Sequence, residues 1–188
     1  MKQYKEGANL FELLKKLKDH RRKQGTRHPL PIVIIIIIMG IMSGAKGERA
    51  ISRFAKNNKK ELIKMLKIER KKVPSRKVMR IAIQNINFDE LEEIFYRWSL
   101  SQIKIKKGEW INIDGKAIAS TLSEHRGKFQ NFISLVTCFV NKKKQALKVG
   151  RIENKKESEI PKVKELIENL GLKGAIFTMD ALHCQKKL

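Results

Sequence analysis

Two aspartates of this chain have surroundings that are typical of metal ligands. Asp114 and Asp180 each follow a short apolar run, "INI" in the first case and "AIFTM" in the second. They are 180 − 114 = 66 residues apart, enough for two further strands and a helix between them. Because the ends of neighbouring strands meet at one edge of an α/β sheet, two such carboxylates are able to share one divalent cation. The cation would keep both ionised, and the pair would then be the catalytic anchor of a phosphoryl-transfer site.

The residues leave simpler interpretations of Asp114 open. Asp-Gly after an apolar run is also the signature of a tight hairpin turn. An aspartate at the end of a strand often caps the helix that follows. Spacing alone therefore does not separate a catalytic ligand from a turn residue.

The apolar spacing changes near residue 100 and predicts an α+β fold with two domains. Helical spacing dominates residues 1–101, with one helix expected over 8–20, one opened by Ser75 as N-cap and one opened by Asn87 or Asp89. From residue 102 the order is strand, strand, strand, helix, strand, with a charged hairpin turn over 141–145. We expect a helical, DNA-binding domain over 1–101 and a mixed domain over 102–188.

The most apolar segment, "LPIVIIIIIMGIM" over residues 30–42, predicts a buried helix. Its 13 residues fall short of the roughly 18 to 20 that span a bilayer, and charged residues lie on both sides. A strand and a membrane-attached helix are the alternatives that the composition leaves open. Trp98 and Trp110 lie on or beside apolar faces, so both are assigned to the core.

The charge of the chain favours a polyanionic partner. Lys and Arg number 42 against 19 Asp and Glu, which gives a formal charge of +23, and such a charge is typical of nucleic-acid-binding proteins. An Ile- and Lys-rich composition also arises by drift in AT-rich genomes, but drift does not explain the shortage of acids. The candidate phosphate contacts are the clustered cations Arg21, Arg22, Lys23, Arg27, Lys71, Lys72, Arg76, Lys77, Lys142, Lys143 and Lys144, together with Lys116 beside Asp114.

Three motifs resemble the H-repeat-associated family of DDE-type insertion-sequence transposases. They are "IDGK" at residues 113–116, "K-x-x-E-I-P" at 156–161 and "DALHCQ" at 180–185, in the family's order. The N-terminal half is similar to the helical domain of that family through "R-x-P-L" at 27–30, "AI-x-x-F-A" at 50–55 and "PS" at 74–75. The resemblance extends over residues 9–188.

The resemblance implies a ribonuclease-H-like catalytic fold, here a partial one, in which Asp114 and Asp180 bind Mg²⁺ or Mn²⁺. It implies cleavage and transfer of DNA strands during transposition, with transposon ends and target DNA as partners. A homo-oligomer or an intact transposase is a further partner, and the expected location is the bacterial cytoplasm, at the nucleoid, without a membrane.

The family's third acid has no counterpart, because no Asp or Glu follows Asp180. We therefore expect a C-terminally truncated, inactive fragment. The alternative is a DNA-binding remnant without enzymatic activity that interferes with an intact transposase.

Overall fold

The computed structural model describes residues 7–123, 131–153 and 159–179, which form two compact units. The helical unit is Asn9–Ile94, and the sheet unit comprises Met1–Ala8 with Phe95–Leu188. The boundary falls inside a helix, α6, which continues from the first unit into the second. The α+β class expected from the sequence is confirmed, whereas each unit's role in DNA binding or catalysis remains a prediction.

The helical unit contains α1 (Leu10–Leu14), the 3₁₀ turn η1 (Lys23–Gly25), α2 (Leu30–Met42), α3 (Gly47–Asn57), α4 (Lys59–Met65), α5 (Arg76–Asn85) and the first half of α6 (Phe88–Gln102). The sheet unit contains the rest of α6, β1 (Trp110–Ser123), β2 (Asn131–Val140), η2 (Asn141–Lys143), β3 (Gln145–Glu153), α7 (Glu159–Leu170) and β4 (Ile176–Thr178). The expected order of strand, strand, strand, helix and strand is present.

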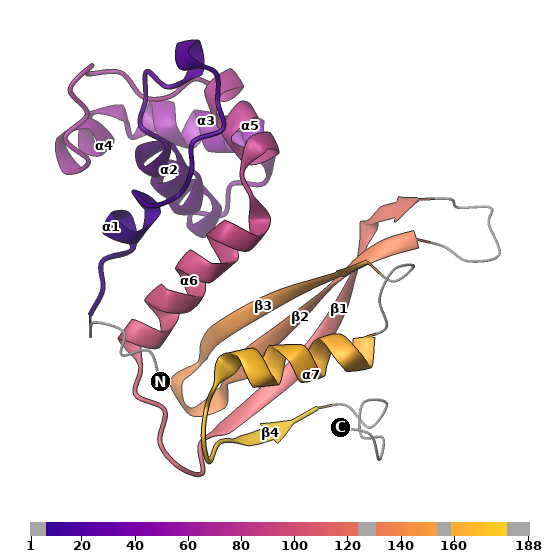
Figure 1. Ribbon diagram of the computed structural model, residues 1–188. Coiled ribbons are helices and arrows are strands. Elements are labelled where there is room, and N and C mark those ends of the chain that lie inside the picture. Colours follow the sequence, from indigo (N-terminus) through magenta and orange to yellow (C-terminus); the bar gives the residue numbers. More distant parts are fainter. Residues whose placement is uncertain (1–6, 124–130, 154–158, 180–188) are drawn as a thin grey trace. The chain divides into compact units, whose positions relative to one another are not determined.

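Helix α2 is the centre of the helical unit, with α1, α3 and α5 packed around it (Figure 1). Val33 and Ile36 are fully buried, and the buried side chains cover more than half of the helix circumference, while Ile35 and Ile38 on the remaining face are half-buried. At Gly40 a Cβ would lie 3.1 Å from Ile51 Cγ2, so α3 approaches α2 closely at this glycine. Packing against α1, α3 and α5 allows this isoleucine-rich segment to be a helix despite its strand propensity, because tertiary packing outweighs intrinsic preference.

The described residues include no single helix that is both long and apolar enough to cross a membrane. Helices α2 and α3 together pass that test by length and composition, but the chain bends by 101° between them.

The helix starts follow the predicted capping residues in two places. The Ser75 hydroxyl accepts a hydrogen bond from the Val78 N–H, and the Asn87 side chain accepts from the N–H groups of Asp89 and Glu90. Asn87 rather than Asp89 is therefore the cap of α6. The helix expected over 8–20 is shorter than predicted, because α1 ends at Leu14. Beyond it, tight turns with hydrogen bonds three residues back bury Leu17 without a continuous helix.

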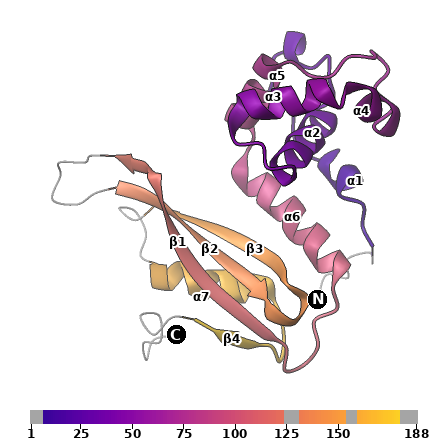
Figure 2. The same cartoon turned by 180° about the vertical axis from the view of Figure 1, so that it is seen from behind.

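The sheet has the strand order β3-β2-β1-β4. β1 and β3 are antiparallel to β2, and β4 is parallel to β1. Helix α7 lies along one face of the sheet, in front of it in Figure 1 and behind it in Figure 2. Ile111 and Ile113 of β1 point to the covered face and join a core with Val163 and Leu166 of α7. Gly171 directly follows α7 with a φ of +59° and ends the helix, which a glycine after an apolar helical pattern predicts.

The face of the sheet opposite α7 carries the other side chains of β1. Trp110, Asn112, Asp114 and Lys116 alternate with the buried isoleucines and are exposed or half-buried. No described helix covers these four side chains. Trp110 is 54% exposed, so its assignment to the core was wrong: its position beside "INI" did not reveal which face of the strand it occupies.

Candidate acidic and nucleic-acid-binding sites

Asp114 lies in the middle of a strand and not at its end. β1 continues to Ser123, and Asp114 pairs with Thr137 of β2. The expected position of Asp114 at the end of a strand was wrong, and a hairpin turn at Asp-Gly is excluded, because this segment continues the ladder with β2. Asp114 is exposed, and within the described residues its carboxylate makes no hydrogen bond or ion pair. An exposed carboxylate of this kind is open to a ligand from solution.

Two hydrogen bonds hold the strands next to Asp114. Asn112, two residues earlier on the same face, accepts a short hydrogen bond from the Thr178 hydroxyl of β4. Its amide donates to Asn141 Oδ1 over 3.1 Å, at the turn that follows β2. Asn112 thus ties β4, β1 and the β2–β3 turn together just before the candidate catalytic position.

Asp180 lies outside the described residues, so its pairing with Asp114 is not tested. Among the residues that the structure does describe, no three His, Cys, Asp or Glu side chains gather as a metal site would require. The strand expected before Asp180 is β4, whose last residue, Thr178, pairs with Asn112 of β1.

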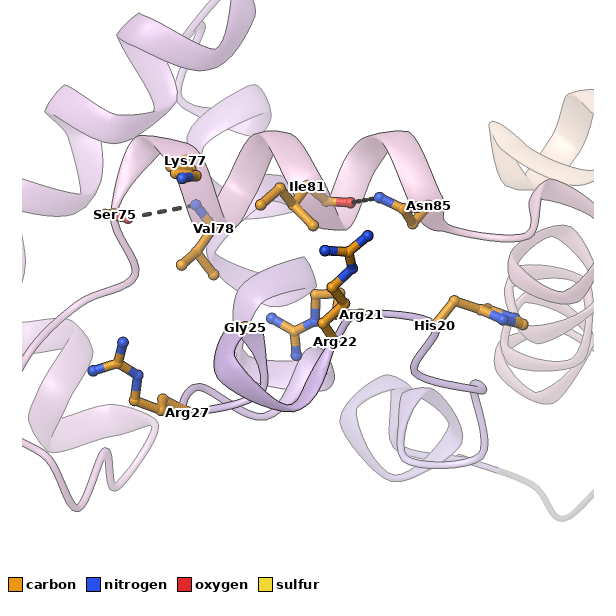
Figure 3. Close-up of a pocket in the computed structure, with 10 residues that line it drawn as sticks. All are labelled: His20, Arg21, Arg22, Gly25, Arg27, Ser75, Lys77, Val78, Ile81 and Asn85. Carbon is orange, nitrogen blue, oxygen red and sulfur yellow. Dashed lines mark hydrogen bonds between the residues drawn. The ribbon is translucent and has the colours of Figure 1, made fainter.

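Four of the predicted phosphate-contacting cations line one cavity of about 610 Å³ in the helical unit. Figure 3 shows that it lies between the loop before α2 and helix α5. The loop contributes His20, Arg21, Arg22, Gly25 and Arg27, and the α5 side contributes Ser75, Lys77, Val78, Ile81 and Asn85. The basic segments around residues 22 and 77 are far apart in sequence, so their meeting follows from the packing of the loop against α5.

Arg21 holds this loop in shape. Its side chain is only 1% exposed and forms a two-pronged ion pair with Asp19, with nitrogen–oxygen distances of 2.7 and 2.8 Å. It also donates to the His28 carbonyl over 2.8 Å. Hydrogen bonds from Arg21 lower the pKa of Asp19, so the pair stays charged. A DNA contact by Arg21 remains a prediction. Because Arg21 is buried, its effect on DNA binding would be indirect: it holds the loop that carries the exposed Arg22 and Arg27.

The remaining predicted cations are divided between the units. Arg76 lies 3.7 Å from Glu48, which also holds Arg80 at 2.6 Å. Lys116 is exposed on the same face of β1 as Asp114. Lys23, Lys71, Lys72, Lys143 and Lys144 are exposed but line neither this cavity nor the hollow described next.

A second hollow, of about 540 Å³, lies in the sheet unit beside Trp110. The cations that line it are Lys106, Lys107 and Lys142, of which the sequence had singled out only the last. The signal that could have found the site is the spacing "KKGEW", in which two lysines come shortly before a tryptophan that opens a strand.

Comparison with known proteins identifies relatives along almost the whole chain. Residues 11–99 match the family model described as DDE_Tnp_1-associated. The chain is 27% identical over 96% of its length to "Putative transposase YncI" of Escherichia coli O157:H7. It is 25% and 26% identical over 95% of its length to "H repeat-associated putative transposase YhhI" and "H repeat-associated putative transposase YbfD" of Escherichia coli K12.

These relatives differ in how much of them the chain covers. It spans 45% of the YncI protein, 46% of YhhI and 69% of YbfD. No solved structure matches the chain.

Proposed function

Since residues 11–99 match the family model described as DDE_Tnp_1-associated and 95% of the chain aligns with H repeat-associated putative transposases, we propose that this protein takes part in DNA transposition through metal-dependent chemistry at Asp114 and Asp180. The observation that carries the proposal is the register of β1 and β4. The two strands are parallel, and their last described pair is Asn112 with Thr178. Asp114 follows Asn112 by two residues on β1, so the two share a face, and Asp180 follows Thr178 by two residues in the sequence.

The topology supports a ribonuclease-H-like assignment within this proposal. Three antiparallel strands, a helix on one face and a fourth strand parallel to the first follow each other in the order that the family resemblance implies. Asp114 then lies on the central pair of strands, on the face that α7 leaves free.

The donor chemistry at Asp114 suits Mg²⁺ or Mn²⁺, because carboxylate oxygens are preferred ligands of both ions. Asp114 and Asp180 would hold the metal, which supplies a more acidic water and stabilises the oxygens of the reacting phosphate. Lys116 is exposed two residues from Asp114 on the same face, and its ammonium group would contact a DNA phosphate. We expect the chain to bind metal through these two carboxylates.

Substitution of Asp114 tests this site. Asp114→Asn removes the negative charge but keeps the shape, so Mn²⁺ affinity should fall by about tenfold or more. Calorimetric titration of the parent and the variant with Mn²⁺ measures the change. Asp89→Asn, which neutralises an exposed aspartate of α6, is the matched control and should bind Mn²⁺ as the parent does. Equal affinities of the parent and Asp114→Asn would contradict the proposed metal site.

A second candidate function, DNA binding without catalysis, is favoured by the basic cavity. Arg22, Arg27 and Lys77 line the same cavity, although Lys77 is about fifty residues from the two arginines in the sequence. Phosphate contacts by such side chains release counterions, so binding must weaken as salt rises. This activity would let the protein interfere with an intact transposase at the same DNA.

Replacement of Arg22 tests the cavity as a DNA-backbone site. Arg22→Ala should weaken duplex DNA binding and reduce the slope of log affinity against log salt by about 1, because one phosphate contact is lost. Fluorescence anisotropy at several salt concentrations measures both quantities. Lys59→Ala removes an exposed cation of α4 outside the cavity and should leave the slope nearly unchanged. A salt-independent interaction would count against both candidate functions.

A further inference from the structure

An exposed aromatic surface lies at the start of β1. Trp110 is 54% exposed, and Ile176, its Cα partner in the parallel strand β4, is 41% exposed. Paired residues of neighbouring strands point to the same face, so the indole and the isoleucine are side by side. Both residues belong to regular strands whose next residues, Ile111 and Phe177, face the core. The exposure of Trp110 therefore follows from the pleat of the strand.

Lysines surround this aromatic surface. The hollow beside Trp110 is lined by Lys106 and Lys107 from the loop before β1 and by Lys142 from the β2–β3 turn, all exposed. Asn141 and Gly108 complete the wall with Glu109, which is only 8% exposed. Three ammonium groups against one carboxylate leave the hollow with a net positive charge. The uncharged indole does not balance this charge, so an anionic ligand would.

Hydrogen bonds hold the hollow in one shape. The Gly108 N–H donates to the Gly174 carbonyl over 2.7 Å, and the Ile176 N–H donates to the Glu109 carbonyl over 2.9 Å. A Cβ at Gly174 would lie 3.0 Å from Lys107 Cγ, so the stem of Lys107 packs on this glycine. The bond between Asn112 and Asn141 fixes the opposite wall. The backbone of the hollow is therefore ordered before a ligand binds, and the ordering cost is left to the lysine side chains.

We propose that this hollow binds an unpaired segment of DNA, with one base stacked on the indole of Trp110 and the neighbouring phosphates against Lys106, Lys107 and Lys142. Aromatic faces combined with lysines along a groove are how proteins bind single strands, since every base offers a π-face and every link a phosphate. Bases within a duplex are already stacked on both sides, so the indole selects an unpaired base. The choice of DNA rests on the transposition function proposed above.

The position of the hollow relates it to the candidate catalytic site. Trp110 and Asp114 lie on the same face of β1, four residues apart, which corresponds to about 13 Å along the strand. A single DNA strand with one base on Trp110 would therefore reach Asp114 if it ran along this face of β1. Trp110 is a binding residue in this arrangement and takes no part in the chemistry.

Single-strand binding by Trp110 variants of the 188-residue chain tests the inference. The probe is a labelled oligothymidylate of about twelve nucleotides, compared with a duplex of mixed sequence. Trp110→Ala should lower single-strand affinity about 5- to 150-fold, the usual range for loss of one stacked base. Duplex affinity should change less than about twofold, because Trp110 lies outside the basic cavity of the helical unit. Trp110→Phe keeps an aromatic face and should restore most of the single-strand affinity.

A fluorescence measurement checks the same contact without loss of the side chain. The chain has two tryptophans, so Trp98→Phe leaves Trp110 as the sole indole. Oligothymidylate should quench its emission as the complex forms. Unchanged emission with bound oligonucleotide would overturn the inference.

The outcomes separate this inference from the proposed function. If duplex binding persists while Trp110→Ala leaves single-strand affinity unaltered, the inference is wrong and DNA binding stands. If the parent binds neither probe, both fail. A change of oligomeric state in Trp110→Ala, without a change in single-strand affinity, would instead assign the surface to a second copy of this chain.

Discussion

Neighbouring arginines in the basic loop have different roles because their burial differs. Arg21 is buried, and its Nε and Nη2 donate to Asp19 and to the His28 carbonyl. Arg22 is exposed at the cavity and carries its charge where a phosphate could reach it. A buried guanidinium with a carboxylate partner fixes a loop, whereas an exposed one binds ligands. The same division applies to Asp114, whose exposed carboxylate is available to a cation.

His28 should make the stability of the helical unit depend on pH. It is 8% exposed, and its burial, followed by the charges of Arg70, Arg21 and Arg27, lowers its pKa. The unfolded chain therefore binds the proton more readily, near pH 6.5. The contribution of neutral His28 is complete above that pH and is lost as the pH falls below it, with a slope of at most about 1.4 kcal/mol per pH unit.

Urea unfolding at several pH values from about 5 to about 8 measures how the free energy of unfolding depends on His28. His28→Gln cannot be protonated and should show a flatter dependence of the free energy of unfolding on pH. His20→Gln, which replaces an exposed histidine, is the matched control. The same slope in the parent and in His28→Gln would show that other groups cause the dependence.

At the scale of elements, α2 shows how packing decides conformation. Its isoleucines would suit a strand, but the surrounding helices bury most of them. A helix satisfies its own backbone hydrogen bonds, so it can be buried among side chains without a partner strand. By contrast, the segment after Lys15 buries only Leu17, and a turn is sufficient there.

Two isoleucines of α2 offer a matched test of this packing. Ile36 is fully buried and Ile41 is 57% exposed. Ile36→Ala should reduce the free energy of unfolding by about 2–5 kcal/mol, because it leaves a cavity in the core. Ile41→Ala should change it by less than about 0.5 kcal/mol. Thermal or urea unfolding measures both, and equal losses would contradict the central position of α2.

At the scale of the whole molecule, the charge of +23 is shared by two units with separate cores. Each unit has its own cationic hollow, one without an aromatic lining residue and one beside Trp110. We expect duplex binding to depend steeply on salt. The whole molecule causes this dependence, because the summed field of many lysines attracts the DNA in addition to the few direct contacts. The different linings predict different preferences, for duplex in the helical unit and for single strands in the sheet unit.

The sequence by itself determined the order of elements, the α2 core, the Ser75 cap, the end of α7 at Gly171 and the relationship to transposases. These depend on local spacing and short motifs, which are written along the chain. Only the tertiary structure decided that Arg22 and Lys77 meet, that Asp114 lies within a strand and that Trp110 faces outward. Such features depend on which distant segments pack together and on which face of a sheet remains uncovered. Periodicity marks a strand but does not say what will lie against each side of it.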